Sequence, residues 1–180
     1  MSKAEKKVFC EDVVMAGFGG QGLMFIGKLL AYSAMKEGKH VTWIPSYGPE
    51  MRGGTANCTV VVSSEEIGSP VATHPCAVIV MNNPSLEAFE PRLRRDGLLL
   101  LNTSTVHRQT KRKDVNIMPV PAGEIASSSG AERSANMVML GVYVALTKVV
   151  SEESIIDGLK ELFGKKVDLF DTNVRAFQEG

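Results

Sequence analysis

The stretch Val13-Val14-Met15-Ala16-Gly17-Phe18-Gly19-Gly20-Gln21-Gly22 decides the fold, because an apolar run leads directly into three spaced glycines. The segment Val8 to Ala16 is predicted to be a strand that is apolar on both faces, as in the middle of a covered parallel sheet. A helix is expected next, because apolar residues recur at helical spacing: Leu23, Ile26, Leu30 and Ala34. A strand, a Gly-rich turn and a helix in this order indicate a Rossmann-like α/β domain.

The rest of the chain predicts one three-layer domain of 180 residues with a mostly parallel sheet. The segment Thr55–Ser63 alternates and is β-branched, so we expect it to form an antiparallel hairpin through Ser64–Gly68. A second strand is expected at Val41–Ile44, where Pro45 would stop it, and it would join the first strand in a right-handed βαβ unit. Further strands are expected at Ala77–Met81, Gly97–Asn102 and Val115–Val120. Helices are expected at Pro84–Leu93, Ser134–Val150, from the Ser151 cap to Gly164, and Asp171–Gln178.

Charge and composition exclude several classes of partner. The 20 basic and 20 acidic residues cancel, so no global field would draw in nucleic acid or an anionic membrane. The charged start, Met1 to Lys7, is no signal peptide, and the most apolar helical stretch is too short to span a bilayer. We therefore expect a soluble cytoplasmic protein. The three scattered cysteines have no disulfide, zinc or iron–sulfur spacing, so no metal site is predicted: Cys10, Cys58 and Cys76.

The helix from Asn136 to Leu146 is apolar on nearly all sides. Such a helix either crosses the core of its own domain or faces another chain, and both readings stay open. We predict that the isolated chain self-associates or is poorly soluble, because such a helix would leave apolar surface exposed once partner chains are absent.

The three glycines form the pattern G-x-G-x-x-G between a strand and a helix. In this pattern Gly17 would allow the sharp turn, Gly19 would let a ligand approach the backbone, and Gly22 would let the helix pack closely on the strand. The free N–H groups at the helix start could hold an anion. NAD binding also needs an acidic residue at the end of the second strand, which reads Trp43-Ile44-Pro45-Ser46. An NAD-dependent dehydrogenase is therefore only an alternative. The candidate contacts with a ligand or subunit in this turn are Gly17, Phe18, Gly19, Gly20, Gln21 and Gly22.

A second candidate segment follows the second strand, at the sheet edge where ligands of open α/β folds bind. Its Arg52 could pair with a phosphate or carboxylate, and contact with a ligand or subunit is the favoured interpretation; a solvated loop with an internal Glu50–Arg52 pair is the alternative. The candidate contacts there are Ser46, Tyr47, Gly48, Pro49, Glu50, Met51, Arg52, Gly53 and Gly54. Farther along, the Lys111-Arg112-Lys113 run is expected to be a solvated turn, with contact to an acidic partner as the alternative. No catalytic residue is assigned.

These two motifs in register resemble the gamma subunit, or gamma domain, of 2-oxoacid:ferredoxin oxidoreductases. The resemblance continues through Thr55 to Thr59, Ile67 to Pro70, Asn82 to Leu86 and the helix from Asn136 to Gly141, so it covers nearly the whole chain. The Tyr-Gly-Pro-Glu-Met-Arg-Gly-Gly form is more similar to the 2-oxoglutarate and branched-chain subclass than to the pyruvate one.

The resemblance implies an enzyme of several chains that oxidatively decarboxylates a 2-oxoacid, forms an acyl-coenzyme A and reduces ferredoxin. Thiamine diphosphate, magnesium and iron–sulfur clusters would lie on alpha, beta and delta partner subunits. This chain would bind none of them alone; its role would be structural, or it would gate substrate or contact coenzyme A. The related indolepyruvate oxidoreductase subunit is the alternative with the same chemistry.

Overall fold

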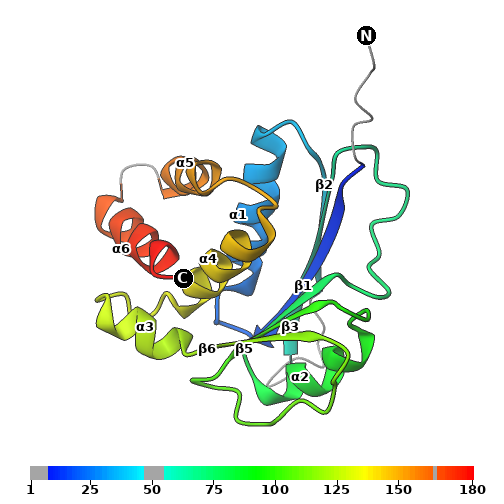
Figure 1. Ribbon diagram of the computed structural model, residues 1–180. Helices are drawn as coiled ribbons and strands as arrows, with labels where there is room; N and C mark the ends of the chain where they lie inside the picture. Colours follow the sequence, from blue (N-terminus) through cyan, green and yellow to red (C-terminus); the bar gives the residue numbers. More distant parts are fainter. Residues whose placement is uncertain (1–7, 47–54, 164–165) are drawn as a thin grey trace.

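The computed structural model describes residues 8–46, 55–163 and 166–180, and it places a six-stranded sheet between two helical layers (Figure 1). The strands are β1 (Cys10–Phe18), β2 (His40–Ser46), β3 (Thr55–Ser63), β4 (Ala77–Val80), β5 (Leu98–Asn102) and β6 (Asn116–Val120). The helices are α1 (Leu23–Lys36), α2 (Asn83–Phe89), the 3-10 helix η2 (Glu90–Arg92), α3 (Ala122–Ser128), α4 (Ala135–Thr147), α5 (Glu152–Phe163) and α6 (Val167–Gln178).

The strand order is β2-β3-β1-β4-β5-β6. Strands β1, β4, β5 and β6 pair in parallel, whereas β3 lies antiparallel between β1 and β2. The predicted three-layer, mostly parallel fold with an antiparallel element and C-terminal helices is therefore confirmed.

The partners of β3 differ from the sequence prediction. We expected Thr55–Ser63 to form a hairpin through the residues that follow it, but it pairs with β1 and β2, which both precede it. Strand β2 is consequently parallel to β1 without touching it, so the predicted βαβ unit has a strand inserted in its middle. Alternation shows that a segment is a strand, but it does not show which neighbour the strand will choose.

Pro45 does not end β2, contrary to the prediction. The strand continues to Ser46, with Pro45 opposite Cys58 of β3. Strand β2 is an edge of the sheet, and a proline is tolerated on an edge because its missing N–H can face away from the neighbouring strand.

Two hydrophobic cores cover the two faces of the sheet. The larger one packs α1, α4 and the C-terminal helices against alternate residues such as Val13, Met15 and Ile79. The smaller one packs α2 against the opposite face, which carries Val14 and Val78. Alternate residues of β1 and β4 thus serve both layers, which explains their continuous apolar runs. Figure 1 shows α1, α4, α5 and α6 together on one side of the sheet and α2 on the other.

Helix α4 lies inside the domain and packs against α3 and α6. Residues Asn136 to Gly141 and Tyr143 are buried within this chain, and Leu146 is exposed. The core reading of this apolar helix is therefore confirmed, and the reason for expecting self-association is removed.

The remaining helices show one omission and two differences in length. The sequence prediction missed α3, and it began the last helix at Asp171 although α6 begins at Val167. The helix predicted at Pro84–Leu93 is divided into α2 and η2. None of the helices in the described ranges is both long and apolar enough to cross a membrane.

The start of α5 is tied to the end of α1. The Ser154 N–H donates to Ser151 Oγ at 3.1 Å, which confirms the predicted cap. Glu37, directly after α1, accepts hydrogen bonds from the Ser151 N–H at 2.7 Å and from Ser154 Oγ at 2.7 Å. Its other carboxylate oxygen lies 2.6 Å from Lys39 Nζ. One carboxylate therefore joins two helices of the same layer.

Candidate functional site

The Gly-rich turn between β1 and α1 is closed by its own glutamine. Gln21 Oε1 accepts a hydrogen bond from the Phe18 N–H at 2.6 Å, and Gln21 Nε2 donates to the Met81 carbonyl at 3.1 Å. Gln21 thereby fastens the turn to the end of β4. Phe18 is 40% exposed beside it.

One glycine of the turn serves a role that differs from the predicted one. A side chain at Gly17 would overlap the side chains of Leu23 and Met81. Glycine is therefore needed here for close packing and not for a sharp turn. The positive φ angles lie at Gly20, +92°, and at Gly22, +74°. Gly19 has open space where a Cβ would lie, which fits the predicted access for a ligand.

A crevice of about 370 Å³ adjoins this turn. It lies where β1, β4 and β5 end and where α1, α3 and α4 begin, which is the place where open α/β folds bind ligands. Its lining residues are Gly20, Gln21, Met81, Asn102, Ser104, Thr105, Gly123, Glu132, Arg133, Ala135 and Asn136.

Asn102 provides an amide group at the crevice. Its side chain lines the crevice although the residue is only 1% exposed. The oxygen Oδ1 accepts from the Ser104 N–H at 3.2 Å, whereas Nδ2 has no hydrogen-bond partner in the described part of the chain. The amide of Asn102 is therefore available to an acceptor bound in the crevice.

The surrounding groups are suited to binding. Helices α1 and α4 both begin at the crevice, and their first N–H groups carry partial positive charge. Arg133 and Glu132 provide charges of both signs. Thr105 Oγ1 donates to the Met81 carbonyl at 2.9 Å. The arrangement offers donors to an anion or an amide-containing ligand.

Sequence reasoning missed the crevice residues on β5, α3 and α4. A usable signal was present, since the polar residue Asn102 ends the buried run from Leu98 to Leu101. The convergence of Asn102 with Asn136 depends on how the helices pack, which no local pattern reveals.

The structure brings part of the predicted site together. Ser46 ends β2 at the level of Ala16, because both pair with Asn57 of the intervening β3. It therefore lies at the same sheet edge as the turn. The rest of the second predicted segment lies outside the described residues, so its contact with the turn stays a prediction: Tyr47, Gly48, Pro49, Glu50, Met51, Arg52, Gly53 and Gly54.

Two of the three cysteines are buried. Burial raises the pKa of the Cys58 thiol to about 12 and that of the Cys76 thiol to about 12 as well, so both thiols are protonated at neutral pH. Cys10 is exposed. Within residues 8–46, 55–163 and 166–180, no three His, Cys, Asp or Glu side chains come together as a metal-binding group.

Comparison with known proteins gives relatives along nearly the whole chain. Residues 12–180 match the protein family described as pyruvate ferredoxin/flavodoxin oxidoreductase. The chain is 41% identical over 169 residues to the ketoisovalerate oxidoreductase subunit VorA of Methanothermobacter marburgensis, a match that covers 93% of this chain and 35% of that protein. It is 30% identical over 173 residues to the 2-oxoglutarate synthase subunit KorC of Methanocaldococcus jannaschii, covering 94% of this chain and 91% of that protein.

A solved structure has the same fold over both full lengths. The gamma subunit of a keto/oxoacid ferredoxin oxidoreductase from Geobacter sulfurreducens superposes with a TM-score of 0.81 at 27% identity, covering 94% of this chain and 95% of that one. The resemblance seen in the sequence motifs is thereby confirmed. The chain belongs to the pyruvate ferredoxin/flavodoxin oxidoreductase family, in which it corresponds to the gamma subunit.

Proposed function

We propose that this chain, folded as a single gamma-type domain, is one subunit of a cytoplasmic enzyme that oxidatively decarboxylates a 2-oxoacid to an acyl-coenzyme A and reduces ferredoxin. Alpha, beta and delta subunits would complete the assembly and hold the thiamine diphosphate, the magnesium and the iron–sulfur clusters. The observation that carries this proposal is the alignment with a gamma-sized relative over 91% of the relative's length. Because the chain spans only 35% of VorA, the activity is assigned to the assembly.

Coenzyme A is the ligand we assign to the crevice and the Gly-rich turn. It carries phosphates and amide groups, and it supplies the thiol that accepts the acyl group. The residues fit such a ligand, because Asn102 presents an amide at the crevice and Gly19 leaves the backbone open. The starts of α1 and α4 favour negative charge at the same place. This chain would hold and orient coenzyme A while the chemistry proceeds on partner subunits.

The substrate we favour is 2-oxoglutarate or a branched-chain 2-oxoacid. Support comes from two relatives: a 2-oxoglutarate synthase subunit that is 30% identical to this chain and a ketoisovalerate oxidoreductase subunit that is 41% identical. Pyruvate and indolepyruvate are the competing substrates.

Purification of the native complex through an affinity tag on this chain tests the proposal. We expect the partner subunits to copurify and the complex to reduce a dye only when a 2-oxoacid and coenzyme A are both present. The substrate is identified by comparing kcat/KM for 2-oxoglutarate, 3-methyl-2-oxobutanoate, pyruvate and indolepyruvate. Purification of this chain without partners, or an activity that does not depend on coenzyme A, would contradict the proposal.

A further inference from the structure

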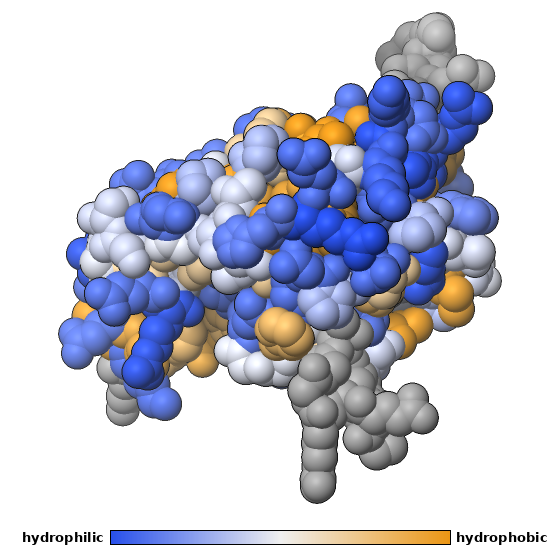
Figure 2. All heavy atoms as spheres, turned by 90° about the horizontal axis from the view of Figure 1, so that it is seen from below, coloured by the Kyte–Doolittle hydropathy of each residue, from blue (hydrophilic) through white to orange (hydrophobic). Residues whose placement is uncertain are grey.

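A set of exposed cations lies on the α2 side of the sheet, outside the lining of the crevice. Residues 90–115 contain seven Lys and Arg but only three Asp and Glu, although the whole chain is neutral. We call the outward-facing members of this segment the basic face: Arg94, Arg95, Arg108, Lys111 and Lys113. Figure 2, which views the molecule from below, shows a largely hydrophilic surface with only scattered hydrophobic residues.

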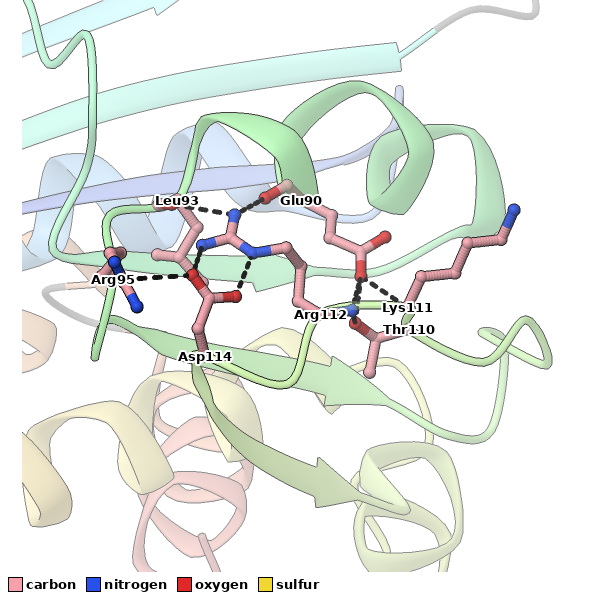
Figure 3. A network of polar contacts seen from close by, with 7 residues as sticks. All are labelled: Glu90, Leu93, Arg95, Thr110, Lys111, Arg112 and Asp114. Atoms are coloured by element: carbon pink, nitrogen blue, oxygen red, sulfur yellow. Dashed lines mark hydrogen bonds and ion pairs between the residues drawn. The ribbon is translucent and has the colours of Figure 1, made fainter.

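The loop that carries Lys111 and Lys113 is fixed by a polar network (Figure 3). Glu90 Oε1 accepts hydrogen bonds from Thr110 Oγ1, from the Lys111 N–H at 3.0 Å and from the Arg112 N–H at 3.3 Å. The start of the same loop is held on α2, because Asn83 Oδ1 accepts from the N–H groups of His107 and Arg108. The loop therefore presents its charges from a defined position.

Arg112 neutralises the acidic group nearest to the loop. Its guanidinium donates to both carboxylate oxygens of Asp114, at 2.6 and 2.9 Å, and its Nη1 also donates to the carbonyls of Glu90 and Leu93. The two neighbouring lysines are left pointing outward, and Figure 3 shows the Lys111 ammonium extending away from the network. The sequence prediction of a merely solvated turn was therefore wrong for Arg112, whose side chain is only 22% exposed.

The composition of the basic face favours a partner that binds and leaves. Permanent interfaces have a large apolar centre, whereas transient electron-transfer contacts are small and are steered by charge. The basic face consists of exposed charges, with Arg95 86% exposed. Two of its cations lie next to carboxylates, Arg108 at 2.9 Å from Glu87 and Arg95 at 3.8 Å from Asp114. These carboxylates interrupt the positive charge, which disfavours the continuous phosphate backbone of a nucleic acid. An acidic protein surface with discrete charges is the better fit.

We infer that the basic face is the docking surface for the acidic side of the diffusible protein that accepts the electrons of the reaction. This inference rests on the proposed function, which requires such an acceptor. The cluster that delivers the electrons would belong to a partner subunit, and the basic face would hold the acceptor next to it by reversible, charge-steered contacts.

The test uses the purified complex and the ferredoxin of the same organism. The double variant Lys111→Glu with Lys113→Glu reverses two outward charges without removing any side-chain contact of the network. We expect the KM for ferredoxin to rise about tenfold at low ionic strength, and the difference to shrink at high salt. The kcat with a small dye acceptor should stay at the wild-type value. The matched control, Lys160→Glu with Lys166→Glu, makes the same charge change at α5 and α6 and should leave the KM for ferredoxin unchanged.

Direct binding separates this inference from the proposed function. Calorimetry measures the binding of ferredoxin to the complex without turnover. If the Lys111 and Lys113 variant binds ferredoxin more weakly and the control variant does not, the docking surface is supported even where no 2-oxoacid activity is found. Equal ferredoxin affinity in wild type and variant would overturn it. Tight binding of a 20-nucleotide RNA that is lost in this variant, with unchanged ferredoxin kinetics, would assign the basic face to nucleic acid and also overturn it.

Discussion

The side chain of Asn136 donates from Nδ2 to the carbonyl of Gly22 at 3.2 Å, which joins the start of α4 to the start of α1. A Cβ at Gly22 would overlap that same amide. The positions of two helix N-termini beside the crevice thus depend on a residue that has no side chain and on one buried amide.

Replacement of Gly22 by alanine should destabilise the protein by about 1–3 kcal/mol, because alanine would be strained at φ +74° and would displace Asn136. The free energy of unfolding from urea titration measures the effect. Gly20→Ala is the control, since Gly20 also has a positive φ but faces open space. If the two variants lost the same stability, the contact with Asn136 would have no part in fixing the helices.

Asn102→Asp should raise the KM for coenzyme A at least two- to tenfold, which corresponds to one lost hydrogen bond of about 0.5–1.5 kcal/mol. The new carboxylate can still accept from the Ser104 N–H, but it cannot donate. The KM for the 2-oxoacid should not change. Asn116→Ala removes an exposed amide at the opposite end of the sheet and is the matched control. An equal effect in both variants would exclude a specific role for Asn102.

Arg52 is predicted from the sequence to contact an anion beside the Gly-rich turn. Hydrogen bonds to charged groups contribute about 1.5–3 kcal/mol, so Arg52→Ala should weaken the interaction roughly ten- to a hundredfold. Arg52→Lys should restore it only in part, because lysine lacks the planar guanidinium. A higher KM for coenzyme A in an intact complex identifies a ligand contact, whereas loss of assembly by size-exclusion chromatography identifies an interface residue. Wild-type behaviour in both assays would leave the arginine as solvated surface.

The stability of the protein should fall as the pH is lowered from about 4.5 to about 2, through Glu37. Burial alone would raise the pKa of this carboxyl, but the hydrogen bonds from Lys39, Ser151 and Ser154 outweigh it and lower the pKa to about 2. A carboxyl with a lowered folded-state pKa stabilises the fold above its unfolded-state value and loses that contribution in acid. Glu37→Gln should cost about 1–3 kcal/mol at pH 7 and less at pH 3, as measured by urea unfolding. Glu152→Gln, at an exposed position of α5, is the matched control.

The chain should bind neither NAD nor NADP with a micromolar Kd. Dinucleotide-binding domains place an acidic residue at the end of the parallel strand beside the first one. That position beside β1 is occupied here by the antiparallel β3, and the second strand ends in Ser46. Calorimetry with each nucleotide is the measurement, and a micromolar Kd for either would revive the dehydrogenase alternative.

Features encoded within a few residues were predictable, and features that depend on packing were not. The run from Val13 to Ala16 identified a strand that serves two layers, and Ser151 identified the start of α5. The position of β3 between β1 and β2 was missed, because an alternating strand can pair equally well with a strand before or after it. Helix α3 was missed since its seven residues carry little periodic signal.

The candidate site shows the same division. The glycines located the sheet edge correctly, but the role of Gly17 was predicted wrongly, because only coordinates show that it faces Met81 and that the positive φ angles lie at Gly20 and Gly22. Asn102 was overlooked because one polar residue at the end of a strand is usually a cap. It becomes a candidate ligand contact only when the fold places its amide beside a crevice.

Both edge strands of the sheet contain a proline, Pro45 in β2 and Pro119 in β6. A proline breaks the row of N–H donors that an added strand would need. Neither edge therefore offers a complete template for stacking copies into aggregates. Edge-to-edge pairing is disfavoured at both ends of the sheet, so contacts with another chain are left to the helices and loops on its faces.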